Sequence, residues 1–266
     1  MSEIKNKRIW LTGASSGIGE ALAFALNKAG AYLVISSRRQ SELQRVQGEC
    51  ANPSRVKILT LDLSQPSSLE NKAMEAMALW EGGIDILINN GGISQRSRII
   101  QTDHSVDRKL MEVNYFGNIA LSKAVLPSMV RKQAGHHVVI TSAVGIISTP
   151  LRSSYAASKH ALHGFYDALR TEHYQDNIKV TLVCPGFIHT KISINALTKD
   201  GSAQNTMDTA QENGMTAEKC AQLIINAIKK NKEEVYIGGF KEKLGIYVKR
   251  YWPSLFSKMV RKMAVT

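Results

Sequence analysis

The chain has 266 residues, of which 44% are hydrophobic and 21% charged, a size and composition that one α/β domain commonly has. No stretch approaches the roughly 20 consecutive apolar residues of a membrane span, and the first residues lack the apolar run of a secretory signal. The cysteines Cys50, Cys184 and Cys220 match no metal or disulfide spacing. We therefore expect one cytoplasmic domain over residues 1–266, without a metal site.

The net charge of +12 is concentrated near the C-terminus. Residues 241–266 contain seven lysines and arginines and a single acid, Glu242. A basic segment can bind nucleic acid, but no known nucleic-acid motif accompanies this one, so we expect no nucleic-acid partner. A solvated basic face is the simplest interpretation of the charge.

Short apolar runs predict seven strands, at residues 8–12, 31–36, 56–61, 84–88, 137–141, 178–184 and 235–237. Helices are predicted at residues 17–28, from the end of the second strand to about residue 50, and at 69–80, 105–131 and 154–174. This alternation indicates an α/β fold with a single Rossmann-type, doubly wound parallel sheet and helices on both faces. Ligands bind such sheets at the carboxyl ends of the strands. The long polar stretch 187–215 is predicted to be a substrate loop.

A glycine-rich turn follows the first strand and reads Thr-Gly-Ala-Ser-Ser-Gly-Ile-Gly from Thr12 to Gly19. Backbone amides at a helix start can hold phosphate, and glycines permit a tight turn and close approach to a ligand. The spacing is not the commoner Gly-x-Gly-x-x-Gly, and a purely structural turn is the alternative. The residues predicted to hold a dinucleotide here are Gly13, Ser15, Ser16, Gly17, Ile18 and Gly19.

Arg38 and Arg39 follow the second strand, where an acidic residue would bind the ribose of NAD. Guanidinium groups pair well with the 2′-phosphate of NADP. These residues therefore predict NADP(H) as the cofactor, while two solvated arginines at a helix start are the alternative.

Two further strand ends carry residues suited to a cofactor. Asp62, with Leu63 after it, could bond an adenine amino group or cap a helix. Asn90, Gly91 and Gly92 follow the fourth strand, where small residues let a cofactor lie close to the backbone.

Tyr155 and Lys159 lie four residues apart on a predicted helix, and Ser142 follows the fifth strand. Residues at this spacing share a helix face, so the lysine charge would favour the ionised phenol. Lowering a phenol pKa by about three units takes about 4 kcal/mol. Lys159 and an oxidised nicotinamide could supply this together in a low-dielectric cleft. We therefore expect Tyr155 to transfer a proton while Ser142 holds the substrate oxygen.

These motifs, in this order, resemble the short-chain dehydrogenase/reductase family, in its short single-domain branch, from about residue 7 to 237. One departure is Gly91, which stands where the family has alanine. The resemblance implies that Tyr155 is the acid/base, that Lys159 also holds the ribose, and that Asn114 supports a water chain. It also implies that the cofactor contacts Tyr155, Lys159, Pro185, Gly186, Ile188 and Thr190, with Thr190 near the carboxamide.

Within the family, Ser-Ser-Arg-Arg after the second strand and the basic tail are most similar to the dehydrogenase/reductase member 7 type and the 11-beta-hydroxysteroid dehydrogenases. The resemblance implies NADP(H)-dependent hydride transfer between nicotinamide and a carbonyl or secondary alcohol. It also implies a homodimer or homotetramer packed through helices 105–131 and 154–174. A 3-oxoacyl-(acyl-carrier-protein) reductase is the nearest alternative enzyme, although such chains usually end soon after the seventh strand. A non-catalytic NADP-sensing protein is the other alternative, but it would not need Ser142, Tyr155 and Lys159 together.

Residues 240–266 form a basic, amphipathic C-terminal extension, in which Pro253 separates two short predicted helices. Its apolar residues, from Leu244 to Met263, interleave with lysines and arginines. Such a segment can lie on an anionic bilayer or pack on its own domain with the lysines solvated. We expect it to border the substrate entrance and to touch a membrane surface loosely, which would suit a lipophilic substrate.

Overall fold

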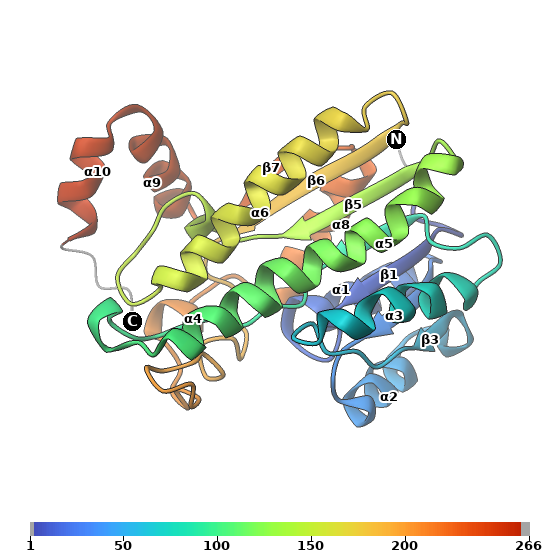
Figure 1. The fold of residues 1–266 in the computed structure, drawn as a ribbon, viewed down its shortest axis with the longest axis horizontal. Coiled ribbons are helices and arrows are strands. Elements are labelled where there is room, and N and C mark those ends of the chain that lie inside the picture. The colour runs from blue at the N-terminus through green and yellow to red at the C-terminus, as the bar shows by residue number, and fades with distance from the viewer. Residues whose placement is uncertain (1–2, 262–266) are drawn as a thin grey trace.

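Seven parallel strands form a single sheet in the computed structural model, which describes residues 3–261. The strand order is β3-β2-β1-β4-β5-β6-β7. The first three strands extend the sheet to one side and the last four to the other, so the order reverses at the neighbouring strands β1 and β4. The strands are β1 (Arg8–Thr12), β2 (Tyr32–Ser36), β3 (Val56–Ile58), β4 (Ile86–Asn89), β5 (Gly135–Ile140), β6 (Ile178–Pro185) and β7 (Glu234–Ile237). Helices cover both faces, and the predicted doubly wound Rossmann-type sheet is confirmed (Figure 1).

The helices connect the strands and extend beyond the last of them. They are α1 (Gly17–Lys28), α2 (Gln40–Glu49), α3 (Pro66–Ala78), α4 (His104–Met111), α5 (Gly117–Arg131), α6 (Ser153–Glu172), α7 (Thr209–Glu212), α8 (Ala217–Lys229), α9 (Phe240–Tyr251) and α10 (Pro253–Val260). The predicted long helix 105–131 contains a π-helical turn at Glu112–Phe116, which divides α4 from α5. Pro253 begins α10, as expected for a residue that tolerates the first helical position.

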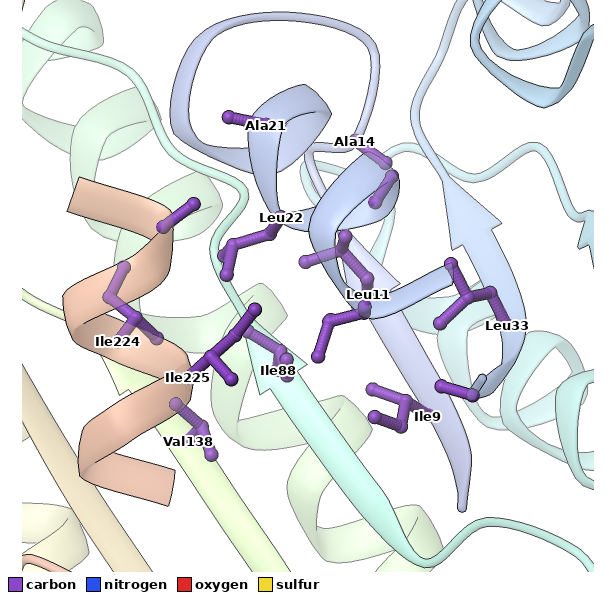
Figure 2. Close-up of a cluster of buried hydrophobic side chains, with 14 of the residues drawn as sticks. Ile9, Leu11, Ala14, Ala21, Leu22, Leu33, Ile88, Val138, Ile224 and Ile225 are labelled. Carbon is purple, nitrogen blue, oxygen red and sulfur yellow. The ribbon is translucent and has the colours of Figure 1, made fainter. Parts of the chain in front are cut away.

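Apolar side chains fill the space on each side of the sheet. On one face, Leu11 of β1 and Ile88 of β4 meet Leu22 of α1 and Ile224 of α8, all fully buried (Figure 2). On the other face, α3, α5 and α6 pack on the same strands. Each fully buried aliphatic side chain contributes about 1.5–3 kcal/mol. The two apolar layers hold the strand ends in fixed positions.

Leu121 and Val125 of α5 are fully buried in this second layer. These two residues are therefore not available for the predicted packing of helix 105–131 against a second copy. Phe116 is the residue of this segment that keeps a large exposed apolar area, at 45%.

The substrate loop, residues 187–215, is irregular apart from α7 but is firmly attached. Leu197 pairs with the segment after β4, because its N–H donates to the Ser94 carbonyl and its carbonyl accepts from the Arg96 N–H, both at 2.8 Å. Beyond β7, α9 and α10 stand at one end of the molecule (Figure 1). Among the described residues, no helix is both long enough and apolar enough to span a bilayer. Lys262 and Met263 of the basic extension lie outside the described residues.

Candidate active site

The glycine turn after β1 has a backbone that only glycine accommodates easily. Gly13 and Gly17 have φ angles of 65° and 58°, in the left-handed region that favours glycine. A Cβ at Gly19 would lie 2.1 Å from the Gly13 carbonyl oxygen. Gly19 therefore packs behind the turn, and it is the one predicted glycine of this turn that does not line the cavity.

Thr12 and Asn90 join β1 to β4 at the point where the strand order reverses. The Asn90 side-chain amide donates to the Thr12 and Gly13 carbonyls at 3.0 and 3.1 Å. The Thr12 hydroxyl accepts from the backbone N–H groups of Asn90 and Gly91 at 3.1 and 3.0 Å. A Cβ at Gly91 would lie 2.6 Å from a methyl of Leu63, so the leucine occupies the space that the family's alanine would need.

One cavity of about 990 Å³ connects these strand ends. Its wall includes most of the predicted site: Gly13, Ser15, Ser16, Gly17, Ile18, Arg38, Arg39, Asp62, Leu63, Asn90, Gly91, Gly92, Ser142, Tyr155, Lys159, Pro185, Gly186, Ile188 and Thr190. The donor set fits a dinucleotide, because helix-start amides suit a pyrophosphate and guanidiniums suit a further phosphate. Asp62 also accepts from the Ser64 N–H at 2.9 Å in a local turn, but it does not cap a helix as the alternative interpretation proposed, because Gln65 is the N-cap of α3.

Ser142, Tyr155 and Lys159 meet in the inner part of this cavity. Tyr155 and Lys159 are 9% and 4% exposed, and the lysine Nζ lies 5.9 Å from the centre of the tyrosine ring. Nζ donates to the Ile140 carbonyl at 2.9 Å, which fixes the ammonium at the end of β5. Burial lowers the pKa of Lys159 to about 8.

The pKa of Tyr155 is raised, because burial disfavours the charged phenolate. This direction is opposite to the one expected from the Tyr-x-x-x-Lys spacing. A hydrogen bond from Ser142 and the charges of Arg96 and Arg152 act against the rise. The groups that oppose desolvation in this structure therefore include two arginines that sequence reasoning missed.

Asn114 lies in the π-helical turn and is fully buried outside the cavity. Its side-chain oxygen accepts from the Ile93 N–H at 2.8 Å, and its amide donates to the Ile93 carbonyl at 2.9 Å and to Ser158 Oγ at 3.0 Å. The side chain thus fixes the backbone beside Gly92 and the helix that carries Tyr155. Its implied part in a water chain stays a prediction.

Comparison with known proteins identifies the group to which this arrangement belongs. A family model described as short chain dehydrogenase matches residues 7–201. The chain belongs to the short-chain dehydrogenase/reductase family. It is also 41% identical to the mouse (Mus musculus) protein named dehydrogenase/reductase SDR family member 7B, covering 98% of this chain and 82% of that one. The resemblance to the family and to its member 7 type is confirmed.

Two solved structures share the fold of this family member. A Burkholderia phymatum short-chain dehydrogenase/reductase in complex with NAD has a TM-score of 0.84 and 22% identity, covering 96% of each chain. A Burkholderia cenocepacia short-chain dehydrogenase in complex with NADP has a TM-score of 0.80 and 22% identity, covering 97% of this chain and 99% of that one. The fold therefore accommodates either nicotinamide cofactor, and residues of the individual chain must select between them.

A short segment after β4 positions the helix that carries Tyr155 in this family member. Gln95 is fully buried, and its side-chain oxygen accepts from the N–H groups of Ser154 and Tyr155 at 2.9 and 3.2 Å. These are among the first amides of α6, which have no partner within the helix. Gln95 thereby caps the helix at Tyr155, a role that its place in the sequence does not reveal.

Arg96, Arg152 and Asp208 form a buried ion cluster, and its two arginines line the cavity. The Asp208 carboxylate accepts from Arg96 at 2.8 and 2.5 Å and from Arg152 at 3.2 Å. All three side chains are at most 5% exposed. Arg152 lies three residues before Tyr155 in the sequence, whereas Asp208 is one of three acids in the irregular stretch 187–215.

The C-terminal extension borders the cavity. Leu244 and Gly245 of α9 and Phe256 and Met259 of α10 line it, and Phe256 is 7% exposed. Lys249 donates to the Ile146 carbonyl, which ties α9 to the segment after β5. The outer side of the same helices leaves large apolar residues exposed: Phe240, Tyr247, Tyr251, Trp252 and Leu255.

Among the described residues, the only group that resembles a metal site is His163, Cys184 and Glu234. Cys184 Sγ lies 3.8 Å from His163 Nε2 and 3.7 Å from a Glu234 oxygen. The same His163 nitrogen hydrogen-bonds the Thr141 hydroxyl at 3.2 Å, and burial raises the pKa of Cys184 to about 12. A protonated thiol in a hydrogen-bonded group accounts for these contacts.

Proposed function

We propose that this family member is an NADP(H)-dependent oxidoreductase that interconverts a carbonyl and a secondary alcohol on a lipophilic substrate. The observation that carries the proposal is the convergence of Ser142, Tyr155 and Lys159 in the cavity that also contains the glycine turn and Arg38. A protein that only senses a cofactor would not require a proton donor buried beside an ammonium group.

The residues divide the chemistry between them. When bound, NADPH supplies the hydride that the carbonyl carbon receives during reduction. The Tyr155 hydroxyl gives its proton to the carbonyl oxygen, and Ser142 donates a hydrogen bond that holds that oxygen in place. Lys159 favours the phenolate that remains, because its charge lies close to the ring. In the opposite direction the Tyr155 phenolate takes the proton from the alcohol.

Arg38 and Arg39 support NADP(H) over NAD(H). Both are exposed at the rim of the cavity, and neither forms an ion pair within the described part of the chain. A 2′-phosphate would give these guanidiniums a charged partner. No acidic residue stands at the end of β2 to bind a free 2′-hydroxyl.

The lipophilic substrate is supported by the residues at the outer end of the cavity. Ile147, Phe187, Ile192, Leu244 and Phe256 make this end apolar. Because α9 and α10 supply part of this wall, the chain differs from a 3-oxoacyl carrier-protein reductase that ends near its last strand. Residues 187–215 act as the substrate loop, since Ile192 and Leu197 of this loop also line the cavity.

The proposal extends to the surroundings of the protein. The exposed aromatic residues of α9 and α10, flanked by lysines and arginines, suit a loose contact with an anionic bilayer, with the protein otherwise in the cytoplasm. Packing of α4–α5 and α6 against a second copy would form a homodimer or homotetramer and cover Phe116.

A direct assay tests the proposed reaction. Purified protein is mixed with NADPH and a panel of short polar, long-chain and polycyclic ketones, and cofactor oxidation is followed by absorbance. Turnover with hydrophobic ketones and NADPH is expected. Cofactor binding without turnover on any ketone, or on the matching alcohols with NADP⁺, would favour the sensing interpretation.

A further inference from the structure

The Arg96–Asp208–Arg152 cluster joins three separate parts of the site. Arg96 lies in the segment after β4, Arg152 directly precedes α6, and Asp208 lies in the substrate loop just before α7. All three side chains are almost completely buried. The Arg96 guanidinium has its remaining bonds inside the protein, since it also donates to the Ser94 hydroxyl at 2.9 Å and to the Gln95 carbonyl.

Stability alone does not explain such a cluster. Removing charges from water is costly, and replacing a buried ion pair by apolar residues of similar volume is often neutral or stabilising. Among the described side chains of the cluster, two are positive and one is negative. Because its bonds are internal, Arg96 is unsuited to bind a substrate anion directly. Its charge can still act through space on a neighbouring group.

Tyr155 is the neighbour on which this charge acts. Arg96, Arg152 and Tyr155 line the same cavity, and Arg152 precedes Tyr155 by three residues at the helix start. Both arginine charges favour the phenolate, against the effect of burial. Other charged groups of the described residues also line this cavity or contact the first turn of α6: Arg38, Arg39, Asp62, Asp107, Lys109, Lys159, Lys191 and Glu242.

We propose that the Arg96–Asp208–Arg152 cluster sets the charge at the catalytic tyrosine. Its arginines stabilise the ionised phenol of Tyr155, and Asp208 limits their effect while it fixes the substrate loop to the catalytic helix. This inference rests on the proposed function of Tyr155. It makes Arg96 and Asp208 positioning residues, and it adds a second source of positive charge to Lys159.

The test is a titration of Tyr155 that needs no substrate. Tyrosines are labelled with carbon-13 at Cζ, the Tyr155 signal is assigned by its loss in Tyr155→Phe, and its pKa is read with and without NADP⁺ over the pH range that keeps the fold. Arg96→Gln should raise the Tyr155 pKa and Asp208→Asn should lower it, each by about one unit, the low end for a nearby charge. The double variant restores the charge count and should return close to the wild-type value.

Arg98→Gln is the matched control, because it removes the same charge from an exposed residue two positions away and should leave the Tyr155 pKa unchanged. Arg152→Gln replaces Arg96→Gln if that variant does not fold, with the same expected direction. A purely structural cluster would give no shift, or the same direction in both single variants, and either result overturns the inference. NADP⁺ binding and turnover are measured separately, so failure of the proposed function would appear there and not in the variant shifts.

Discussion

The proposed selection of NADP(H) depends on two exposed side chains that follow β2. We predict that Arg38→Asp weakens NADPH binding and improves NADH binding, because a carboxylate repels the 2′-phosphate and accepts a bond from a 2′-hydroxyl. Hydrogen bonds to charged groups contribute about 1.5–3 kcal/mol, so the loss for NADPH should be about 10- to 100-fold. The Kd of each cofactor is measured by titration. Arg131→Asp, at the exposed end of α5, is the control, and equal losses for both cofactors would refute the assignment.

The residues of the site differ in how far the sequence can reveal them. Tyr155 and Lys159 are four positions apart on one helix, so their meeting follows from local geometry. Arg96 and Asp208 are separated by 112 positions, and their contact depends on how an irregular loop folds back. The direction of the Tyr155 pKa likewise depends on burial, which no spacing rule contains.

Among the strands, β5 carries a buried imidazole, and the effect of this group on the free energy of unfolding can be measured. His137 is fully buried, and neither ring nitrogen has a hydrogen-bond partner among the described residues. Burial lowers its pKa to about 4. At pH values between about 4 and about 6.5, the pKa in the unfolded chain, the unfolded chain binds a proton that the folded chain does not. The protein therefore loses stability as the pH falls through this window, by about 1.4 kcal/mol per unit for this group.

We predict that His137→Leu raises the unfolding temperature at pH 7 and raises it further at pH 5, because the variant has no proton to take up on unfolding. His136→Leu is the matched control on the same strand. His136 Nε2 is hydrogen-bonded to the Thr181 hydroxyl at 2.8 Å, so its removal should lower stability at pH 7. The unfolding temperatures of the wild type and both variants, measured at pH 7 and pH 5, test this prediction. A His137→Leu gain that is smaller at pH 5 than at pH 7 would contradict the argument.

The strength of an apolar pattern did not by itself decide which elements were predicted. The sequence predicted β1 and α1 with the bounds that the structure has. It missed α8, although both local signals are present: Thr216 caps this helix by accepting from the Lys219 N–H at 3.3 Å, and the buried residues recur at helical spacing. It also missed the π-helical turn, since a five-residue change of helix type leaves the apolar pattern almost intact.

At the scale of the whole molecule, α9 and α10 have two different sides. We predict that full-length protein sediments with anionic liposomes at low salt and that a chain ending at residue 241 does not. Trp252→Ser with Leu255→Ser alters only exposed positions and should reduce binding while activity on a soluble ketone remains. Phe256→Ala alters the cavity wall and should reduce activity while binding remains. Failure of the full-length protein to bind would remove the membrane contact from the account.

The oligomeric state tests the exposed face of the central helices. We predict a mass of at least twice 29.3 kDa in solution, because Phe116 is a large apolar residue left 45% exposed beside α5. Phe116→Glu should shift the protein toward the monomer, since it places a charge in the interface. Met74→Glu on α3, which is 53% exposed, is the control. Light scattering at micromolar concentration that shows only monomer for the wild type would exclude this interface.

The most direct test of the central claim separates cofactor binding from turnover in Tyr155→Phe. The change removes the hydroxyl and keeps the ring, so NADPH should bind with nearly unchanged Kd while turnover falls about 100-fold or more, the usual loss for a positioned acid/base. Lys159→Met should lose both turnover and affinity for NADPH. If Tyr155→Phe kept more than about a tenth of the wild-type rate, another group would donate the proton, and the assignment of this site would be wrong.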